Sequence, residues 1–412
     1  MIGINELRRL NPQAWTSLLA QDTDHGSIRV TAVERQKLNL SDQAFRYVLS
    51  LDGYLEPISL IGKETNVPEA LFFGNIANEI SEIAPHCWIC HIEGDKGWVI
   101  HEESYNDYLP VEWTAIDIER IIDRLVNLHA SMWEQEEELG QIGFSSLIGG
   151  VGPEIGKELL NKDAQALLQP LKLSKRIASW DRGDLSLPSE HAISSAGNLG
   201  LELIHSAVAL EKIIQRGGWP GIFEDSHRQA AADLLDDPMP MLYPLVQLPS
   251  TLIHGNAAPQ SWSLDLLDNC QLSNWRSARI GPSIYDIVCF IENLNLIQNK
   301  EGKYSLRQHW PISEETILDS YILAMGRHLG SIYSPVLTRQ AFPAAVSLYV
   351  LIVEIPKLAN WIEKGDGDQF NWASLSVKDD DRLQEAGYSE IAALRPFWSN
   401  VFTKFLSAYR SL

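Results

Sequence analysis

The stretch 251–293 limits the possible folds of this chain more than any other, because it combines several local signals in one order. An apolar lead-in ends at His254-Gly255 and is followed by a loop of small and polar residues. Two short apolar segments, 262–267 and 271–275, flank an Asp-Asn turn and predict a hairpin. After Gly281-Pro282, apolar residues recur at helical spacing. The stretch therefore predicts a loop, a hairpin and a helix in succession.

The N-terminal part of the chain carries the strand signals. Segments 28–36, 43–54 and 56–64 alternate or run apolar and predict strands, with an Asp-Gly hairpin turn after the second. Segment 67–80 predicts a helix, since it has a proline near its first turn and apolar residues on one side. Segment 86–103 predicts two more strands around a glycine-containing turn. The resulting order is three strands, a helix and two strands.

Most of the remaining chain predicts helices. The clearest is 116–133, whose apolar residues lie on one face, and further helical patterns cover 314–333, 339–364 and 394–412. Residues 140–250 alternate helical stretches with loops rich in Gly, Pro and Asp. The sequence therefore predicts an α+β protein in which the strands come first and the helices follow.

Composition excludes several classes of function. The 412 residues carry a formal net charge of −21, so neither nucleic acid nor an anionic membrane is an expected partner. No uninterrupted apolar run approaches the roughly 18–20 residues that span a membrane, and the N-terminus lacks the apolar segment of a signal peptide. Four cysteines do not form a disulfide framework. These features together predict a cytoplasmic protein.

The stretch 251–293 resembles the catalytic core of the aminoglycoside phosphotransferase and choline kinase-like family. That family has the pattern L-I-H-G-D-x-x-x-x-N, then a hairpin, then I-D-W, then G-P-x-x-x-D. The positions that match it in order are His254, Gly255, Trp262, Trp275, Gly281, Pro282 and Asp286. The resemblance implies a bilobal protein-kinase-like fold, with a small antiparallel-sheet N-lobe over 1–104 and a large, mainly helical C-lobe over 105–412.

Three positions depart from the family pattern, and they are the ones that carry its chemistry. Asn256 stands where the family has its catalytic Asp, and Ser261 and Asn274 stand where it has a metal-binding Asn and Asp. An amide cannot accept the proton of the attacked hydroxyl, and general-base catalysis is typically worth about 10²–10⁴-fold. Mg²⁺ prefers anionic oxygen ligands, whereas both substituted side chains are neutral. The resemblance implies ATP and Mg²⁺ as cofactors, and these substitutions argue against ordinary turnover.

The resemblance also assigns roles outside the rewritten positions. Lys63 resembles the lysine that holds the nucleotide phosphates, and Glu69 resembles its ion-pair partner. Glu102 would lie at the connection between the lobes, where an adenine ring meets backbone groups. Asp286 resembles an internal anchor of the catalytic loop, with hydrogen bonds to backbone near His254 or Gly255. The family's phosphate-covering turn is rich in glycine, whereas segment 37–42 here has none, which argues against tight ATP binding.

Three functional hypotheses follow. The first is a pseudokinase that binds a small molecule or a protein partner in the inter-lobe cleft without phosphoryl transfer. The second is an active small-molecule phosphotransferase in which Asn256 only orients the hydroxyl and Asp265, Asp268 or Asp286 holds the metal. The third is a fold reused for other chemistry on a biosynthetic intermediate. The sequence favours the first and leaves the ligand, the partner and the oligomeric state open.

Overall fold

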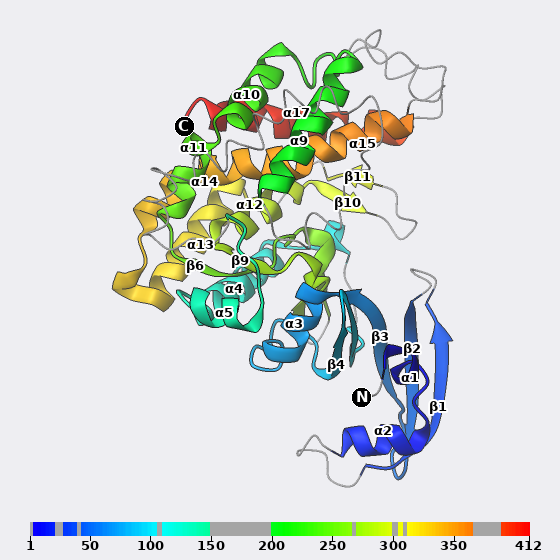
Figure 1. The fold of residues 1–412 in the computed structure, drawn as a ribbon. Helices are drawn as coiled ribbons and strands as arrows, with labels where there is room; N and C mark the ends of the chain where they lie inside the picture. Colours follow the sequence, from blue (N-terminus) through cyan, green and yellow to red (C-terminus); the bar gives the residue numbers. More distant parts are fainter. Residues whose placement is uncertain are drawn as a thin grey trace. The chain divides into compact units, whose positions relative to one another are not determined.

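The computed structural model describes residues 3–20, 28–38, 43–104, 109–148, 199–265, 269–298, 304–307, 311–365 and 389–412 (Figure 1). The chain divides into two compact units. The first unit contains Met1–Leu109, Gln141–Phe144 and Ser261–Ala278, and the second contains Pro110–Gly140, Ser145–Gln260 and Arg279–Leu412. The predicted lobe boundary near residue 104 remains a prediction, and each unit is described separately below.

A five-stranded antiparallel sheet forms the centre of the first unit, in the order β1-β2-β3-β5-β4. Its strands are β1 (Val30–Lys37), β2 (Ala44–Leu51), β3 (Ile58–Asn66), β4 (Cys87–Glu93) and β5 (Lys96–Glu102). Trp15 of helix α2 (Pro12–Leu19) packs on Tyr47 of the sheet, with 5.4 Å between ring centroids. Both side chains are buried, so α2 and the short helix α1 (Ile4–Leu7) cover this face of the core.

Helix α3 (Val67–Asn75) begins directly after β3, where the sequence predicted it. Asn66 caps its first turn, since the side-chain oxygen accepts a hydrogen bond from the backbone of Glu69 at 3.2 Å. Pro68 lies in the same turn, where a missing N–H costs nothing. The cap thus fixes the start of α3 next to the end of β3.

The first unit also contains the hairpin of the stretch 251–293. Its elements are η4 (Pro259–Ser261), β7 (Trp262–Leu264), β8 (Cys270–Leu272) and η5 (Trp275–Ser277). The second strand is shorter than predicted, because Asn274 has left-handed backbone angles (φ 65°, ψ 55°) that end the extended conformation. The Trp275 ring then stacks on Phe72 of α3, with centroids 3.5 Å apart. The hairpin is therefore packed against α3 within this unit.

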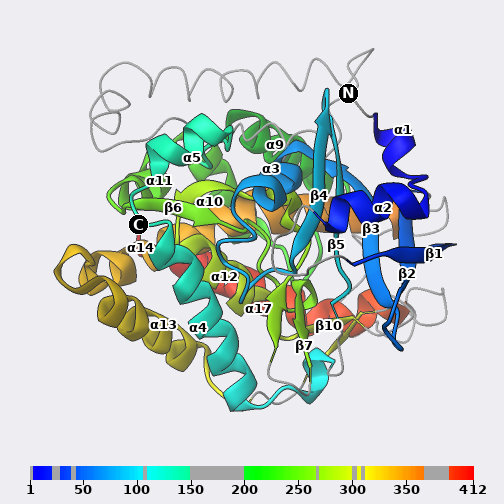
Figure 2. The ribbon, with the colours of Figure 1, turned by 90° about the horizontal axis from the view of Figure 1, so that it is seen from below.

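The second unit is mainly helical. Its helices are α4 (Ala115–Ser131), α5 (Glu136–Ile142), α9 (Leu199–Gln215), α10 (Asp225–Asp236), α11 (Met239–Val246), α12 (Ile284–Asn293), α13 (Glu314–Leu329), α14 (Pro335–Tyr349), α15 (Ile355–Gly365) and α17 (Ser389–Tyr409). Figure 2 shows α4 and α13 side by side, and the two helices are in contact. Two short strands, β6 (Ser250–Ile253) and β9 (Arg279–Pro282), pair antiparallel and bracket the loop that contains Asn256.

The predicted fold class is confirmed, since an antiparallel sheet in the N-terminal part precedes a mainly helical remainder. One pair of strands was missed. The strands β10 (Leu296–Gln298) and β11 (Tyr304–Leu306) pair in a region that the sequence predicted as mostly helical. Residues 149–198 of the predicted region 140–250, Asp268 and most of the segment 37–42 fall outside the described residues.

The helices α14 and α15 join through a π-helical turn, η7 (Val350–Glu354), into one continuous helical segment. The segment Pro335–Glu363 has the length and mean hydropathy (1.6) of a membrane-spanning helix, and 56% of its most apolar part is buried inside the protein. The sequence reading of uninterrupted apolar runs missed it, because isolated polar residues such as Glu354 divide the segment. Core helices of soluble proteins meet the same criteria, so this is weak evidence for a membrane.

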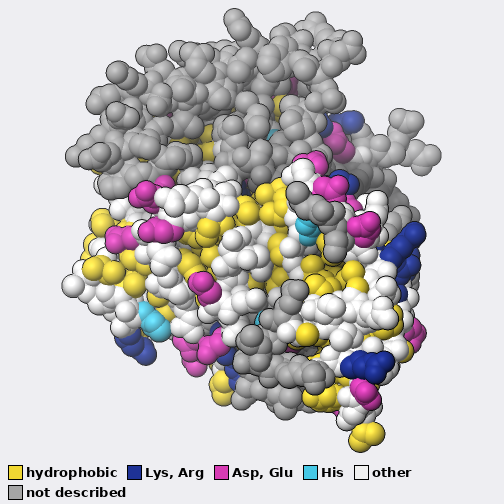
Figure 3. Space-filling model, turned by 60° about the horizontal axis from the view of Figure 1, so that its bottom comes forward, with side chains coloured by type: hydrophobic (Ala, Val, Ile, Leu, Met, Phe, Trp, Pro, Cys, Tyr) yellow, Lys and Arg dark blue, Asp and Glu magenta, His cyan; other side chains and the backbone are white. Residues whose placement is uncertain are grey.

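The molecular surface reflects the acidic composition. On the face drawn in Figure 3, Asp and Glu side chains are scattered among uncharged ones, and Lys and Arg side chains lie in small separate groups. Any attraction for an anionic ligand therefore has to come from a local arrangement of cations rather than from the overall charge.

Candidate functional site

The ion pair expected from the sequence is present in the first unit. Lys63, on β3, places its Nζ 2.7 Å from Oε1 of Glu69, which lies in the first turn of α3. Ala44 of β2 and Val99 of β5 flank Lys63 in the sheet, so its backbone is fixed on both sides. The Glu69 side chain is fully buried, whereas the Lys63 side chain is 21% exposed. The lysine therefore keeps access to solvent or to a ligand while its partner does not.

Glu69 has further partners, which the sequence did not reveal. Thr65 donates a hydrogen bond from its hydroxyl, and the backbone N–H of Trp275 donates to Oε1 at 3.2 Å. The guanidinium of Arg276 lies 3.5 Å from Oε2. Burial alone would raise the pKa of Glu69, but the charge and hydrogen bond of Lys63, the hydroxyl of Thr65 and the charge of Arg276 outweigh it and lower the pKa to about 2. Glu69 is thus a permanent anion that holds two cations.

His101 and Glu102 end strand β5. The backbone N–H of Glu102 donates to the carbonyl of His86 at 3.0 Å, and that of Glu103 donates to Ser59 at 3.3 Å. The buried His101 ring stacks on Phe73, and its Nδ1 lies 2.7 Å from the carbonyl oxygen of Glu102. These backbone groups already have protein partners, so the structure offers no free N–H of Glu102 or Glu103 to an adenine ring. The role predicted for Glu102 remains a prediction.

Burial dominates the titration of His101. It lowers the pKa of the imidazole to about 4, and the positive charge of Lys63 acts in the same direction. The side chain is therefore neutral at physiological pH. A neutral ring is consistent with its stacked position on Phe73 inside the unit.

The loop that contains Asn256 is held by one carboxylate in the second unit. Asp286, in the first turn of α12, is fully buried. Its Oδ2 accepts a hydrogen bond from the backbone N–H of His254 at 2.7 Å, and its Oδ1 accepts one from Gly255 at 2.8 Å. These are the backbone contacts expected of an anchor. Gly255 has φ 76°, a conformation that favours glycine at this bend.

His129 and Tyr321 extend this arrangement. The Nε2 of His129, on α4, lies 3.2 Å from Oδ2 of Asp286, and its Nδ1 lies 2.8 Å from the hydroxyl of Tyr321 on α13. Thr251 donates its hydroxyl hydrogen bond to the backbone carbonyl of His129 at 2.8 Å. All of these side chains are buried. His129 therefore acts in packing and positioning, and Tyr321 is a partner that the sequence did not identify.

Asn256 is partly buried just after this anchor. Its backbone N–H donates to Nδ1 of His254 at 3.2 Å, and its side-chain oxygen lies 3.8 Å from the thiol sulfur of Cys289 on α12. Burial raises the pKa of that thiol, so Cys289 stays protonated and can donate weakly to the amide oxygen. Both groups are neutral, so this part of the loop has no proton acceptor equivalent to a carboxylate.

The two neutral residues at the positions where the resembled family has metal ligands lie in the first unit. Ser261 is buried, and its carbonyl accepts hydrogen bonds from the backbone and hydroxyl of Ser273 at 2.8 and 3.0 Å. Asn274 is exposed at its left-handed turn. A hydroxyl and an amide offer dipoles but no anionic oxygen, so this donor set does not fit Mg²⁺. Asn256 belongs to the other unit, and its convergence with Ser261 and Asn274 on one cleft remains a prediction.

Carboxylates that could replace the missing ligands are engaged elsewhere. Both oxygens of Asp286 accept backbone hydrogen bonds. Asp265 accepts hydrogen bonds from the backbone and side-chain amide of Asn269, at 2.9 and 2.6 Å, and so closes the hairpin turn. Asp268 lies outside the described residues. Within the described part of the chain, no cluster of three or more His, Cys, Asp or Glu side chains could hold a metal ion.

Several solved structures align with most of this chain, at 10–12% identity and with TM-scores below 0.5. A choline kinase from Cryptosporidium parvum Iowa II matches 92% of this chain and 89% of its own, with 12% identity and a TM-score of 0.44. A spectinomycin phosphotransferase matches 95% and 99%, with 10% identity and a TM-score of 0.42. An aminoglycoside phosphotransferase from Alicyclobacillus acidocaldarius matches 92% of each chain, with 11% identity and a TM-score of 0.42. No protein-family model and no curated protein matches the sequence.

Proposed function

We propose that this protein is a kinase-like pseudokinase that binds an anionic small molecule through Lys63 and Arg276 and transfers no phosphate. The observation that carries the proposal is the environment of Glu69. One buried carboxylate holds two cations, so the cluster has a net positive charge in a protein whose formal net charge is −21. Local positive charge is what an anionic group requires.

The positive charge replaces what a metal ion supplies in phosphate-binding kinases. In those enzymes Mg²⁺ neutralises the phosphates, and a lysine paired with a glutamate contributes a second cation. Here the lysine–glutamate pair is kept, Asn274 and Ser261 are neutral, and the guanidinium of Arg276 follows Asn274 by two positions. Arg276 is 42% exposed, and its fork of donors suits phosphate or carboxylate oxygens. We therefore expect anion binding that needs no divalent metal.

The absence of phosphoryl transfer follows from Asn256. An amide at this position orients a hydroxyl but does not take its proton, and the nearby Cys289 is a protonated thiol. The carboxylate of Asp286 is engaged by the backbone N–H groups of His254 and Gly255 and by the ring of His129. We also propose that the protein is cytoplasmic. A protein partner in place of a small ligand is an alternative outcome, which the experiment below distinguishes.

Calorimetric titration with ATP, ADP and pyrophosphate, each with Mg²⁺ or with EDTA, tests the proposal. We expect binding of at least one of these probes to be equal in both conditions, and Lys63→Met combined with Arg276→Met to abolish it. Lys96→Met is the matched control, because Lys96 lies on the same sheet but pairs with Glu64. A ligand at 100 times its Kd also raises the unfolding free energy by about 2.7 kcal/mol, so thermal melts give a second readout.

Three results would overturn the proposal. Tight binding that depends strongly on Mg²⁺, or phosphorylation of a small alcohol by the unmodified protein, would establish the active phosphotransferase instead. A protein partner at the same two cations would be favoured if none of the three anions bound and if the wild type, but not the double variant, captured a protein. Binding that survives the double variant would remove Lys63 and Arg276 from the site.

A further inference from the structure

Two large apolar side chains lie on the surface of the first unit, in the turn between β2 and β3. This hairpin tip consists of residues 52–57. Leu55 is 103% exposed, the highest value among the large apolar side chains that the structure describes, and the neighbouring Tyr54 is 61% exposed. Hairpin turns are usually polar, because they meet water. The hairpin tip therefore presents an apolar surface that a partner can cover.

The hairpin tip is also acidic. Asp52 and Glu56 flank its apolar residues, and both are exposed. Arg29 is an exposed cation next to Asp52, whose backbone N–H donates to the carbonyl of Arg29 at 2.8 Å. Two carboxylates against one guanidinium leave a net negative charge, so an anionic membrane would repel the tip. The tip suits a protein surface that is apolar at its centre and positively charged at its rim.

The second unit has such a surface at the corner between α13 and α14. This helical corner consists of residues 323–339 and includes the short helix η6 (Gly330–Ile332). The large apolar side chains exposed on it, by between 42% and 65%, are Leu323, Ile332, Val336 and Leu337. Single apolar residues are normal on a surface, so their placement decides whether they form a patch.

An ion pair between the two helices brings two of these side chains together. Asp319 of α13 pairs with Arg339 of α14, and both side chains are half-exposed. Leu323 lies one turn after Asp319, and Val336 lies one turn before Arg339. Both steps lead from the same ion pair toward the corner, so Leu323 and Val336 share one exposed face.

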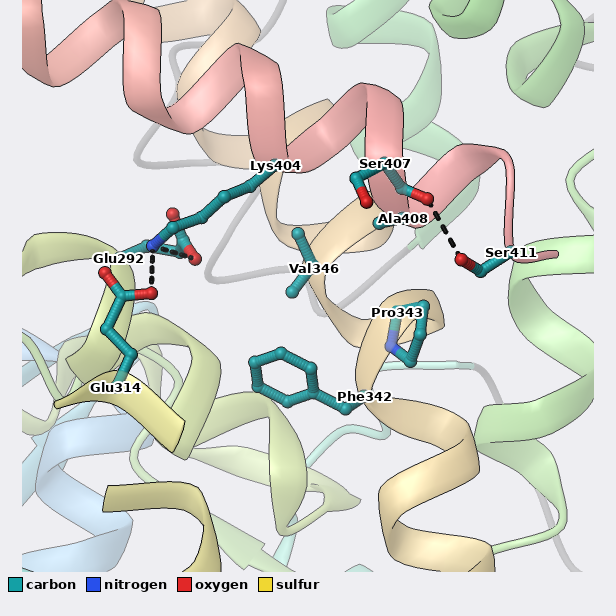
Figure 4. Close-up of a pocket in the computed structure, with 9 residues that line it drawn as sticks. All are labelled: Glu292, Glu314, Phe342, Pro343, Val346, Lys404, Ser407, Ala408 and Ser411. Atoms are coloured by element: carbon teal, nitrogen blue, oxygen red, sulfur yellow. Dashed lines mark hydrogen bonds and ion pairs between the residues drawn. The ribbon is translucent and has the colours of Figure 1, made fainter. Parts of the chain in front are cut away.

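Farther along, α14 packs against α17. Phe342 and Val346 of α14 line an internal cavity together with Lys404 and Ala408 of α17 (Figure 4). Among the described side chains of α14, the exposed large apolar ones lie in its first turn, within the helical corner. The corner is therefore the part of this helix where a partner can bury apolar surface.

The charge of the helical corner complements that of the hairpin tip. Residues 323–339 include Arg327, His328 and Arg339 but no Asp or Glu, in a chain whose formal net charge is −21. Arg339 is paired with Asp319, and Arg327 is exposed. The corner thus offers the acidic tip both an apolar contact and a charge of opposite sign.

We propose that the hairpin tip of one copy docks on the helical corner of a second copy. Leu55 then covers Val336, and Glu56 faces Arg327. The two surfaces differ, so the contact either closes into a reciprocal pair or a ring or continues as a chain. The net charge of the whole chain disfavours an anionic membrane at the corner. The inference is independent of the proposed function, because the anion-binding cations lie on neither surface.

The size of the contact limits its strength. Stable interfaces use about 20–30 residues on each side, whereas the hairpin tip spans only residues 52–57. We therefore expect a reversible association that populates oligomers at high micromolar concentrations.

Sedimentation velocity of the full chain over a range of micromolar concentrations tests the inference. We expect the sedimentation coefficient of the wild type to rise with concentration, and Leu55→Ser and Val336→Ser each to reduce the association constant at least about tenfold. Val111→Ser is the matched control, because Val111 is 45% exposed in the short helix η2 (Pro110–Glu112) and belongs to neither surface. Thermal melts establish that each variant is folded.

A mixture of the two variants distinguishes tip-to-corner docking from other contacts. Leu55→Ser keeps an intact corner and Val336→Ser keeps an intact tip, so each supplies the surface that the other lacks. Fluorescently labelled Leu55→Ser should therefore sediment faster with an excess of unlabelled Val336→Ser than with an excess of unlabelled Leu55→Ser.

Three results of these measurements would overturn the inference. They are a wild-type sedimentation coefficient that does not change with concentration, undiminished association of a folded tip or corner variant, and a mixture that sediments no faster than Leu55→Ser alone. Flotation of the wild type, but not of Val336→Ser, with phosphatidylserine vesicles would assign the corner to a membrane and would also overturn it.

Discussion

At the scale of single residues, the buried carboxylates of Glu69 and Asp286 have the same structural role. Each lies in the first turn of a helix and accepts hydrogen bonds from the backbone of a distant loop. Glu69 holds the N–H of Trp275, and Asp286 holds those of His254 and Gly255. A carboxylate that accepts backbone hydrogen bonds is fully used by the fold. A carboxylate at either position is therefore explained by its role in holding a loop and is not by itself evidence of catalysis.

Removal of the Asp286 carboxylate is expected to destabilise the protein. Asp286→Ala leaves two buried backbone N–H groups without an acceptor, and we expect a loss of about 1–3 kcal/mol in the free energy of unfolding. Urea unfolding measured by tryptophan fluorescence gives this value. Asp225→Ala, at a carboxylate that is 89% exposed, should leave the midpoint nearly unchanged. Equal midpoints for the two variants would contradict the anchoring role.

His101 should make stability depend on pH in a defined range. Its pKa is about 4 in the folded protein and 6.5 in the reference state, so between these values the unfolded chain binds more protons. The stabilisation is complete above pH 6.5 and is lost as the pH falls through 4, by on the order of 3 kcal/mol. His101→Phe keeps an aromatic ring beside Phe73 and should remove this slope in unfolding measured from pH 7 to 4, whereas exposed His328→Phe should not. An unchanged slope in His101→Phe would refute the assignment.

At the scale of elements, the close packing of α3 on the sheet sets the geometry of the Lys63–Glu69 pair. A Cβ added at Gly97 of β5 would lie 2.5 Å from Cβ of Ala70 in α3 and 3.3 Å from the carbonyl oxygen of Asn66. The helix can approach the strand this closely only because residue 97 has no side chain.

Two glycine substitutions should therefore have opposite signs. Gly97→Ala forces α3 away from β5 and should destabilise the protein by about 1–3 kcal/mol. Gly140→Ala, in exposed α5 with no atom within 4 Å of the added Cβ, should stabilise it by about 0.4–1 kcal/mol. Differential scanning calorimetry measures both. A Gly97→Ala variant as stable as the wild type would show that α3 packs less tightly than described.

The sequence predicted elements and local pairs better than distant contacts. Strong periodicity located α3 and α4, and the motif order predicted that Asp286 would contact the backbone near His254. The end of β8 at Asn274 was missed, because a left-handed residue leaves no apolar pattern. The partnership of His129 with Tyr321 joins positions 192 residues apart, and the pairing of Arg276 with Glu69 likewise spans about half of the chain. Periodicity carries no information about such contacts.

The behaviour of the whole molecule tests whether the neutral side chains would account for the inactivity that we propose. The substitutions Asn256→Asp, Ser261→Asn and Asn274→Asp are small, so the combined variant should fold. We expect ATP to raise the melting temperature of this variant only when Mg²⁺ is present, because the new carboxylates supply anionic metal ligands. This binding should be detectable even if no ATP hydrolysis is. Asn75→Asp adds a charge at an exposed position as a control. If the melting temperature of the combined variant with ATP were the same with and without Mg²⁺, other features of the protein would have to prevent metal binding.

The left-handed backbone of Asn274 has a consequence for how this protein can change over evolutionary time. Only Gly, Asn and Asp adopt that conformation readily, so most substitutions at this position disturb the turn that leads into Trp275. Substitution at this position is thereby confined to a few residue types, and one of them is Asp, the residue found here in the family that the sequence resembles. Asn and Asp codons differ by a single nucleotide. The turn thus keeps Asp accessible at this position through one nucleotide change, whatever role the side chain has.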